Sequence, residues 1–463
     1  MHENVEMSLI ASVSGIRGTI GGEPGYNLTP LDVVRFSAAY ASSVLSKHPQ
    51  AKIIVGRDGR ISGSIVSSLV VSTLQSMGIH VIDAGWSTTP SIEMAVPHYH
   101  AQGGIILTAS HNPKEWNALK LLNEKGEFIS AEEGNRIIQA VHKAQFDFAQ
   151  IDKLGSLSEV SDTIDIHIDQ ILKLDFIPLQ KIKTKKYKVV VDCINSTGAI
   201  AIPKLLEKLN CEFSLINAEI TGDFAHNPEP LPQHLSSLME RTAQSGDLGI
   251  AIDPDVDRLA LVDENGNYFG EEYTLVAAAD FILSKQKGHT VSNLSSSLAL
   301  KHLTENKYGC TYSASPVGEV HVVTEMKKHN AVIGGEGNGG IILPELHYGR
   351  DSLVGIVLIL SLMAERDMTL SELKKTYPVF EMCKDKMEIP SQVAFADIIS
   401  NLTPHYQNAD FITSDGLKLV FPDSWIHIRK SNTEPIIRIY SEAKTLHEAE
   451  SLISSLKNQL KNL

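Results

Sequence analysis

The sequence is short of cysteine and has no long apolar run. Four cysteines among 463 residues show no CxxC spacing, and isolated cysteines of this kind are typical of reduced core side chains in an intracellular protein, rather than of disulfides or zinc ligands. The longest apolar run, residues 353–364, is too short to cross a bilayer and contains Ser361. We therefore expect no membrane partner. The cysteines are Cys193, Cys211, Cys310 and Cys383.

Positive charge is also in deficit. Lys and Arg number 41 against 55 Asp and Glu, which gives a net charge of -14. Non-specific nucleic-acid binding needs a basic surface, so this balance argues against a nucleic-acid partner. Small anionic ligands stay compatible with it, because a local arginine cluster can offset the overall sign. Residues 1–6 contain neither a basic region nor an apolar core, so we expect no signal peptide and a cytoplasmic location.

The chain is too long for a single core and divides by pattern into four parts. Short apolar runs alternate with helical patterns over most of its length, which is typical of α/β architecture. The predicted boundaries enclose three α/β units, residues 1–155, 156–257 and 258–375. In residues 376–463, runs of alternating apolar and polar residues predict antiparallel strands, and a capping box at Thr445 and Glu448 predicts a final helix. That last part is a small α+β module.

A serine follows one of the predicted buried strands. The run GIILTASHNP, residues 104–113, reads as a strand at 105–107 followed by small polar residues, and Pro113 stops any regular element. A serine at the end of a strand lies at the rim of the sheet, where backbone amides can hold phosphate oxygens. Ser, Asn and Pro are also common in ordinary turns. Ser110 and His111 alone therefore do not decide between a turn and a nucleophile.

The strongest single signal is the run DPDVDR, residues 253–258, directly after the predicted strand at 248–252. Three carboxylates at alternate positions of an extended segment share one side, so Asp253, Asp255 and Asp257 can reach one cation. Carboxylate oxygens select Mg²⁺ among the abundant cations, and Mg²⁺ usually completes its shell with water and phosphate oxygens. The alternatives are a solvated acidic turn, or the strand-Asp-x-Asp of haloacid-dehalogenase-type phosphatases, in which Asp253 itself is the nucleophile.

Two further loops have the composition of ligand-binding segments. The run GGEGNGG, residues 334–340, is predicted to be a loop throughout, and Glu336 and Asn338 supply groups that suit sugar hydroxyls or an amine. The other interpretations of this run are a phosphate-binding loop or a flexible turn. It lacks the lysine of a P-loop. The run RKSNTEP, residues 429–435, has the composition expected for holding a phosphate that is bound but not transferred. The alternative is an ordinary polar hairpin loop. Its candidate ligands are Arg429, Ser431, Asn432, Thr433 and, beyond the run, Arg438.

Taken together and in this order, these loops resemble those of the α-D-phosphohexomutase family, which includes phosphoglucomutase, phosphomannomutase and phosphoglucosamine mutase. The resemblance covers nearly the whole chain, with one signature in each predicted domain. The runs SGIRG at 14–18 and WNALK at 116–120 also match flanking segments of the family. The resemblance implies four domains around a central cleft, three of them α/β with mixed sheets and the last α+β. It also implies a monomer or homodimer.

The resemblance implies a mechanism and a role for each loop. Phosphorylated Ser110 would pass its phosphoryl group to a hexose phosphate, giving a hexose 1,6-bisphosphate that returns its other phosphate to Ser110. Mg²⁺, the implied cofactor, would be held by Asp253, Asp255, Asp257 and an oxygen on Ser110. Glu336 and Asn338 would grip the sugar, and the 429–435 loop with Arg438 would hold the spectator phosphate. The implied catalytic residues are Ser110, His111, Lys120, Arg17 and Arg258, with His111 either a general base or a structural residue.

Two departures from the family pattern bear on the substrate. Pro254 replaces a common glycine, which stiffens the acidic loop without removing a ligand. Asn338 replaces the serine that bacterial phosphomannomutases and phosphoglucosamine mutases usually carry, and an asparagine there is a feature of N-acetylglucosamine phosphate mutases. The leading hypothesis is a phosphoglucosamine mutase, with a phosphoglucomutase or phosphomannomutase as the alternative. A hexose-phosphate phosphatase and a non-catalytic sugar-phosphate sensor are the more remote ones.

Overall fold

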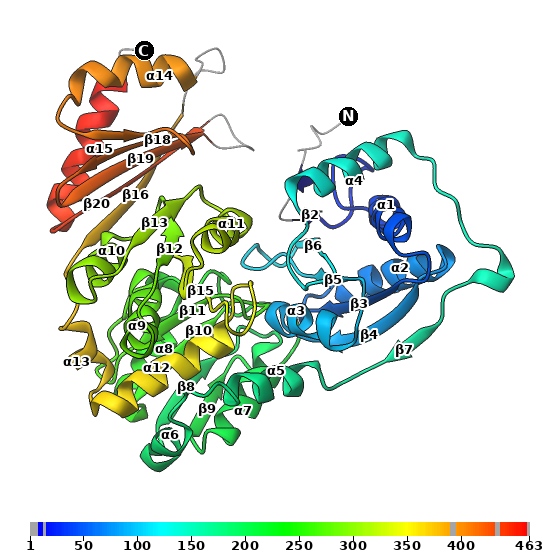
Figure 1. The fold of residues 1–463 in the computed structure, drawn as a ribbon, viewed down its shortest axis with the longest axis horizontal. Helices are drawn as coiled ribbons and strands as arrows, with labels where there is room; N and C mark the ends of the chain where they lie inside the picture. Colours follow the sequence, from blue (N-terminus) through cyan, green and yellow to red (C-terminus); the bar gives the residue numbers. More distant parts are fainter. Residues whose placement is uncertain (1–7, 13–14, 389–394, 431–435, 461–463) are drawn as a thin grey trace.

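The computed structural model describes residues 8–12, 15–388, 395–430 and 436–460. Within these ranges the chain forms four sheets with their helices, in the order expected from the sequence (Figure 1). The first domain, in blue and cyan, lies at one end of the molecule, and the fourth, in orange and red, lies across from it. The second and third domains, in green and yellow, connect the two.

The first domain is built on a seven-stranded mixed sheet of order β1-β2-β6-β5-β3-β4-β7. The strands β5, β3, β4 and β7 pair in parallel, whereas β1, β2, β6 and β5 pair antiparallel. The strands are β1 (Ile10–Ser12), β2 (Gly15–Thr19), β3 (Lys52–Arg57), β4 (His80–Trp86), β5 (Gly103–Leu107), β6 (Trp116–Leu122) and β7 (Leu157–Glu159).

Helices cover both faces of this sheet, which explains why its central strands are continuous apolar runs. On β3, Ile53 and Val55 pack with the helices α1 and α2, whereas Ile54 packs against α3 on the other face, as the alternation of a strand requires. The helix α1 begins after Thr29, with a capping box between Thr29 and Asp32. The helices are α1 (Pro30–Lys47), α2 (Gly63–Ser76), α3 (Thr89–His98) and α4 (Ala131–Lys143).

The second domain has a four-stranded sheet of order β11-β10-β8-β9. β10 pairs in parallel with β8 and antiparallel with β11, so the acidic run at 253–258 is the connection between two hydrogen-bonded neighbours. The strands are β8 (Lys188–Asp192), β9 (Glu212–Ile216), β10 (Leu248–Ile252) and β11 (Leu259–Val262), and the helices are α5 (Thr163–Leu172), α6 (Leu179–Lys185), α7 (Gly198–Lys208) and α8 (Ser236–Ser245).

The third domain has a sheet of order β13-β12-β14-β15. Its strands are β12 (Thr290–Asn293), β13 (Tyr312–Ser315), β14 (Ile333–Glu336) and β15 (Gly340–Ile342), and its helices are α9 (Glu271–Lys285), α10 (Leu298–His302), α11 (Glu319–His329), α12 (Ser352–Arg366) and α13 (Leu370–Lys374). The prediction that residues 334–340 are loop throughout was wrong. Gly334 and Gly335 lie in β14 and pair with Ile342 and Ile341 of β15, so only residues 337–339 form the turn of a hairpin.

The longest apolar run of the sequence became a fully buried helix. Residues 353–364 lie within α12 and are all buried, which is the expected fate of a helix that is apolar on every side. One hydrophobic cluster contains α12 together with residues from the second and third domains, whereas the first and fourth domains have clusters of their own. The second and third domains therefore share one core.

The fourth domain confirms the predicted antiparallel module. Its sheet has the order β16-β20-β19-β18-β17, all antiparallel. Ile426 and Ile428 of β19 pack against the helices, and Arg429 therefore belongs to the opposite face. The elements are β16 (Glu381–Glu388), α14 (Phe395–Leu402), β17 (Asp410–Ile412), β18 (Leu417–Phe421), β19 (Ser424–Lys430), β20 (Ile436–Ala443) and α15 (Leu446–Leu460). The capping box is present in part, since Glu448 N donates to Thr445 Oγ1 over 3.3 Å.

The sheets extend past two of the domain boundaries drawn from the sequence. β7 joins the first sheet beyond residue 155, and β11 joins the second sheet beyond residue 257. β7 follows a long connection after α4, and β11 follows the tight loop after β10, so neither pairing can be predicted from a local pattern.

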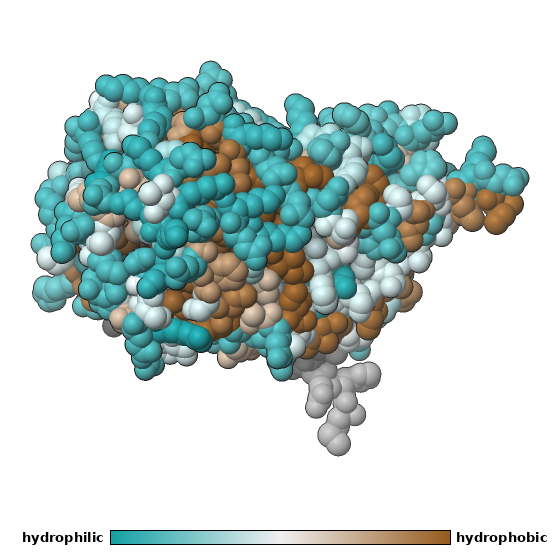
Figure 2. Space-filling model, turned by 90° about the horizontal axis from the view of Figure 1, so that it is seen from below, coloured by the Kyte–Doolittle hydropathy of each residue, from teal (hydrophilic) through white to brown (hydrophobic). Residues whose placement is uncertain are grey.

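Hydrophilic residues cover much of the face seen in Figure 2, and hydrophobic ones gather towards its middle. Among the described residues, no helix is both long enough and apolar enough to cross a membrane.

Candidate active site

A cleft of about 1230 Å³ lies between the four domains. Its walls include residues from β2 in the first domain, from the loop after β10 in the second, from β14 in the third and from β19 and β20 in the fourth. Eight of the predicted site residues line it, so the tertiary structure brings the separate motifs together at one place. They are Arg17, His111, Lys120, Arg258, Glu336, Asn338, Arg429 and Arg438.

Ser110 lies just beyond the end of β5, beneath the floor of this cleft. Its φ of 49° is left-handed, a conformation that non-glycine residues rarely adopt and that often marks a functional site. Thr108 Oγ1 accepts the backbone N–H of Ser110 over 2.9 Å, which supports this turn. Ser110 Oγ donates to Asp253 Oδ2 over 2.6 Å. The turn thus aims the hydroxyl at the acidic loop of the second domain.

Arg60 organises the serine loop, the segment 108–115 between β5 and β6. It was not among the site residues predicted from the sequence. Its guanidinium is fully buried and donates to four backbone carbonyls of the serine loop and the first residue of β6, those of residues 110, 112, 113 and 116, over 2.5–2.8 Å. Asp58 accepts from Arg60 Nε over 3.1 Å and neutralises its charge. A signal for this role was present in the sequence, because residues 58–60 follow β3. β3 is the parallel neighbour of β5, so the loops after both strands leave the same edge of the sheet.

The acidic run is a turn rather than the extended segment we expected. Val256 has a φ of 64°, and its N–H donates to Asp253 O over 3.0 Å. The three carboxylates still converge, since one oxygen of each of Asp253, Asp255 and Asp257 lies within 4.8 Å of the others. Asp253 Oδ1 accepts the backbone N–H groups of Asp257 and Arg258, which locks the turn. The convergence predicted from the spacing is confirmed, but its geometric reason was wrong.

The acidic turn fits a metal ion. All three carboxylates are fully buried, and Oδ1 of Asp255 and Oδ1 of Asp257 receive no hydrogen bond from the described residues. Burial first, and then repulsion by Asp257 and Asp255, raises the pKa of Asp253 well above its usual value. Buried carboxylate oxygens without donors need a cation to offset their desolvation, and an all-oxygen set suits a hard divalent cation.

Two buried cations flank the triplet. Lys120 Nζ lies 2.6 Å from Asp255 Oδ2 and 3.3 Å from Asp257 Oδ2. Burial opposes its charge, but the two aspartates outweigh burial and raise the pKa of the Lys120 ammonium. The second cation is Arg350, which was not predicted from the sequence. It donates to Asp257 Oδ2 over 2.7 Å, to Glu336 Oε2 over 3.0 Å and to Glu319 Oε2 over 3.0 Å. Arg350 therefore couples the acidic turn to the β14–β15 hairpin.

Three arginines from three domains form a positive wall of the cleft. The pKa of Arg17 is lowered by burial and by the charges of Arg258 and Arg438, so these guanidinium groups repel one another. Arg438 and Arg429 are direct cross-strand partners on β20 and β19. Arg429 Nε lies 2.9 Å from Asp415 Oδ2. Guanidinium groups that face each other across a cleft are arranged to bind an anion such as phosphate.

Glu336 and Asn338 lie at the β14–β15 hairpin, where both face the cleft. Glu336 is only 4% exposed, and its oxygens accept hydrogen bonds from Asn293 Nδ2, Gly318 N and Arg350. Asn338 Oδ1 accepts Gly340 N over 3.2 Å. The amide nitrogen of Asn338 is therefore the group of this pair that is left to donate to a ligand.

His111 Nδ1 lies 3.4 Å from Ser110 Oγ, which is a long hydrogen bond. Burial and the charge of Arg258 lower the pKa of His111 well below its usual value. Because Ser110 donates to Asp253 instead, the arrangement differs from that of a hydrolase in which a histidine deprotonates the serine. The remaining predicted ligands Ser431, Asn432 and Thr433 lie outside the described residues.

The whole chain matches one family in four consecutive parts. The matching descriptions are phosphoglucomutase/phosphomannomutase alpha/beta/alpha domain I over residues 9–148, domain II over 165–266, domain III over 270–380 and the C-terminal domain over 383–459. Among similar proteins, a phosphoglucomutase/phosphomannomutase of Thermococcus kodakarensis is 32% identical, over 96% of this chain and 97% of its own. A phosphoglucosamine/phosphogalactosamine mutase of Sulfurisphaera tokodaii is 31% identical, over 97% and 99%.

Solved structures agree with this match at the level of the fold. A phosphoglucomutase/phosphomannomutase family protein of Burkholderia thailandensis has a TM-score of 0.84 and 23% identity, covering 100% of this chain and 98% of its own. An N-acetylphosphoglucosamine mutase of Aspergillus fumigatus, solved with GlcNAc-6P and magnesium, has a TM-score of 0.60 and 14% identity, with 93% and 97% covered.

Proposed function

This chain belongs to the phosphoglucomutase/phosphomannomutase family. We propose that it interconverts the 6- and 1-phosphates of glucosamine. As a phosphohexomutase it is an isomerase-class phosphotransferase, rather than a hydrolase or a non-catalytic sensor. The single observation that carries the proposed reaction is the 2.6 Å hydrogen bond between Ser110 Oγ and Asp253 Oδ2. It joins a hydroxyl that can carry a phosphoryl group to a set of metal-binding carboxylates.

In the proposed reaction Ser110 stores a phosphoryl group between turnovers. The bond between Oγ and phosphorus breaks as a hydroxyl oxygen of the sugar phosphate attacks the phosphorus, the proton of that hydroxyl ends on Oγ, and the sugar becomes a 1,6-bisphosphate. The intermediate turns over in the cleft, its other phosphate returns to Oγ, and the product is the isomeric monophosphate. The left-handed turn at Ser110, held by Arg60 and Thr108, fixes the direction in which the group leaves.

The cationic residues of the cleft stabilise the charge that is transferred. Lys120 and Arg258 line the cleft beside the acidic turn, and Arg17 faces Arg258. Positioned cations stabilise the spread charge of a phosphoryl group in transfer. Arg429 and Arg438, on the fourth domain, hold the phosphate that is not transferred. The cleft can accept the bisphosphate in either orientation, because it offers cations on both sides.

Asp253, Asp255 and Asp257 would hold a metal ion, which we propose is Mg²⁺. Such an ion would supply positive charge to offset that of the transferred group. Asp253 accepts the hydrogen bond of the Ser110 hydroxyl when the serine carries no phosphate. The fit rests on the two carboxylate oxygens of Asp255 and Asp257 that lack donors.

The preference for an amino sugar rests on the third domain. The Asn338 side-chain oxygen accepts the Gly340 N–H, which leaves the amide nitrogen to donate to a ligand. Glu229 and Glu271 also line the cleft, but Glu229 lies 3.6 Å from Arg258 and Glu271 lies 2.7 Å from Lys384, so the preference rests on Asn338 rather than on these carboxylates. Glucose and mannose phosphates are the second candidate substrates, because a relative that is 32% identical is named a phosphoglucomutase/phosphomannomutase.

The decisive experiment compares kcat/KM for glucosamine, glucose and mannose 6-phosphates, since this ratio measures differential transition-state binding. We expect glucosamine 6-phosphate to be favoured, and Asn338→Ser to change the ratio by roughly 10- to 100-fold. Asn306→Ser, on an exposed side chain remote from the cleft lining, is the matched control. A preference for mannose or glucose that survives Asn338→Ser would refute the amino-sugar assignment. Release of inorganic phosphate without isomerisation would instead refute the mutase reaction and favour Asp253 as a phosphatase nucleophile.

A further inference from the structure

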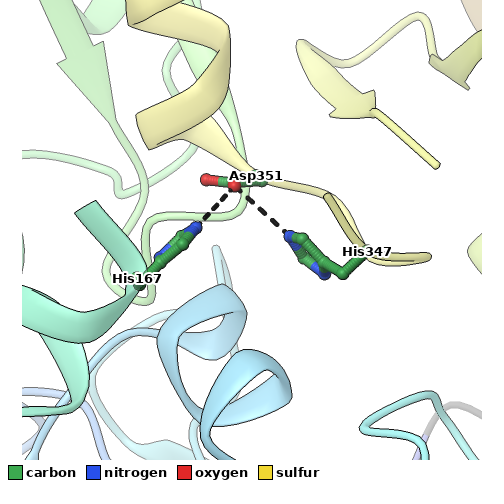
Figure 3. Close-up of side chains that lie close together, drawn as sticks. All are labelled: His167, His347 and Asp351. Carbon is green, nitrogen blue, oxygen red and sulfur yellow. Dashed lines mark hydrogen bonds and ion pairs between the residues drawn. The ribbon is translucent and has the colours of Figure 1, made fainter. Parts of the chain in front are cut away.

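A second group of metal-ligand side chains lies where three parts of the fold meet. His167 comes from α5, and His347 and Asp351 come from the segment that leads into α12. One ligand atom of each of the three lies within 4.8 Å of the others. Figure 3 shows both imidazole rings directed at the carboxylate of Asp351. His167 and Asp351 have fully buried side chains, and that of His347 is 10% exposed.

The nitrogen atoms share one oxygen. His167 Nε2 lies 2.8 Å and His347 Nε2 lies 3.3 Å from the same atom, Asp351 Oδ2. Ligands around a tetrahedral zinc ion are roughly 3.3 Å apart, as bonds of about 2.0–2.1 Å require. The His347 contact already has that spacing, and the His167 contact needs to open by roughly 0.5 Å.

The opposite ring nitrogens lie beside groups that can support a metal-bound histidine. His167 Nδ1 lies 3.1 Å from Ser91 Oγ, and His347 Nδ1 lies 3.3 Å from Glu93 Oε2. A metal-ligating histidine almost always donates its other N–H to a carboxylate, carbonyl or hydroxyl group, which fixes the ring. Both supporting residues come from α3 of the first domain. Asp351 Oδ1 is likewise fixed, because it accepts the N–H groups of Leu353 and Val354 at the start of α12.

Glu93 is the independent observation that points to a cation. Its side chain is 1% exposed, and neither carboxylate oxygen receives an aligned hydrogen bond from the described residues. Glu93 and Asp351 are thus two buried carboxyl groups beside the same pair of imidazole rings. Buried carboxyl oxygens without hydrogen-bond donors are costly, and a divalent cation held next to them offsets that cost.

We propose that His167, His347 and Asp351 bind a zinc ion, with Glu93 and Ser91 supporting the two imidazoles. Two nitrogens and one oxygen suit zinc, whereas Mg²⁺ takes oxygen ligands and keeps several waters. Water fills the fourth position, which the 10% exposure of His347 leaves reachable. The site is separate from the acidic triplet and takes a different class of metal.

The ion has a structural consequence for the cleft. It ties α5, α3 and the segment 347–351, which belong to three domains. Arg350 lies inside that segment and donates to Asp257 Oδ2 of the acidic turn. The zinc site is thus a clamp that fixes the position of Arg350. It rests on the family fold but not on the amino-sugar assignment, so it can fail or succeed independently of the substrate.

The test is metal content of the full-length protein, purified and given zinc in the presence of excess Mg²⁺, which keeps the hard acidic triplet occupied. An Asp255→Asn background removes remaining zinc binding at the triplet. We expect one zinc per chain after dialysis, measured by elemental mass spectrometry. His167→Gln and His347→Gln are expected to lose it. Glu93→Gln is expected to weaken zinc affinity by roughly 10- to 100-fold, as loss of a supporting hydrogen bond does.

Cobalt gives a readout that needs no variant in the cluster, because Co²⁺ in a four- or five-coordinate site with nitrogen ligands absorbs visible light far more strongly than the six-coordinate ion. The matched control is His329→Gln, at an exposed histidine that stacks on His289 and contacts Glu325. It should retain full zinc and the cobalt spectrum. No zinc above background in the unsubstituted protein, a six-coordinate cobalt spectrum, or zinc content unchanged in His167→Gln and His347→Gln would each overturn the proposal.

Discussion

Ser110 Oγ donates to Asp253 Oδ2 over 2.6 Å, although the two residues are 143 positions apart in the chain. The contact joins the first domain to the second. Ser110 follows the buried strand β5, and Asp253 follows the buried strand β10. A loop at the end of one sheet therefore meets a loop of another sheet that carries negative charge.

Ser110→Ala should abolish mutase turnover and leave the fold intact. The hydroxyl is the only group of Ser110 that the proposed reaction uses, and loss of a nucleophile typically costs roughly 10³-fold or more. Turnover is measured with hexose 6-phosphates and a trace of bisphosphate, and folding by the melting temperature. Ser68→Ala, on the exposed surface of α2, should behave like the unsubstituted protein. Substantial turnover by Ser110→Ala would remove this serine from the mechanism.

Removal of divalent metal should stop turnover, and Mg²⁺ should restore it. Metal binding to the native state alone also raises stability, by about 2.7 kcal/mol at a hundredfold excess over Kd. We therefore expect Mg²⁺ to raise the melting temperature of the metal-free protein. Asp255→Asn should remove most of that increase, because Asp255 Oδ1 is one of the two buried oxygens without a donor. An equal increase in the variant would show that Mg²⁺ binds elsewhere.

Arg60→Lys should impair both stability and turnover. A lysine ammonium has three donor hydrogens and no planar fork, so it cannot serve four carbonyls and Asp58 together. Leaving buried polar groups unpaired costs about 1–3 kcal/mol each. We expect a melting temperature lower by several degrees and a kcat that falls more than KM changes, because the serine loop loses its orientation.

Arg57→Lys is the matched control for that prediction. Arg57 lies over the Trp86 ring, and among the described residues no hydrogen bond joins its side chain to the carbonyls that Arg60 holds. Its replacement should change stability and kcat little. Equal losses in both variants would mean that Arg60 acts through general packing rather than by orienting the serine loop.

The fourth domain should lose stability between pH 6.5 and pH 4. Burial lowers the pKa of His427 to about 4 in the folded protein, from about 6.5 in the unfolded chain. The unfolded chain therefore binds the proton first as pH falls, so this contribution is fully present above pH 6.5 and is lost towards pH 4. The full difference is about 3 kcal/mol.

His427→Gln should flatten the dependence of the unfolding free energy on pH in that window. The groups that face His427 are Ser295 Oγ, the Asp415 carbonyl, Lys418 and Arg429. Denaturant unfolding followed at several pH values measures the slope. An unchanged slope would assign the acid sensitivity to other groups.

Helices and strands were predicted correctly from the sequence where a single local interaction or a single apolar pattern determines them. The strand predicted at 248–252 is β10, because an apolar run without polar alternation must be covered on both faces. The helix predicted after Thr445 is α15, because capping is a local interaction. The glycine-rich run at 334–340 was misjudged, since its strand pairing depends on Ile341 and Ile342 across the hairpin rather than on its own propensity.

The sequence by itself determined the chemical types of the site. The serine after β5, the three aspartates after β10 and the arginines of β19 and β20 each stand where a strand ends or alternates, and that placement is readable from spacing alone. Only the tertiary structure decided what these groups contact. Arg60 and Arg350 bind carbonyls and carboxylates far away in the chain, and Glu93, His167, His347 and Asp351 meet only when three domains pack together. Contacts between distant segments depend on how whole cores pack, and no local pattern contains that information.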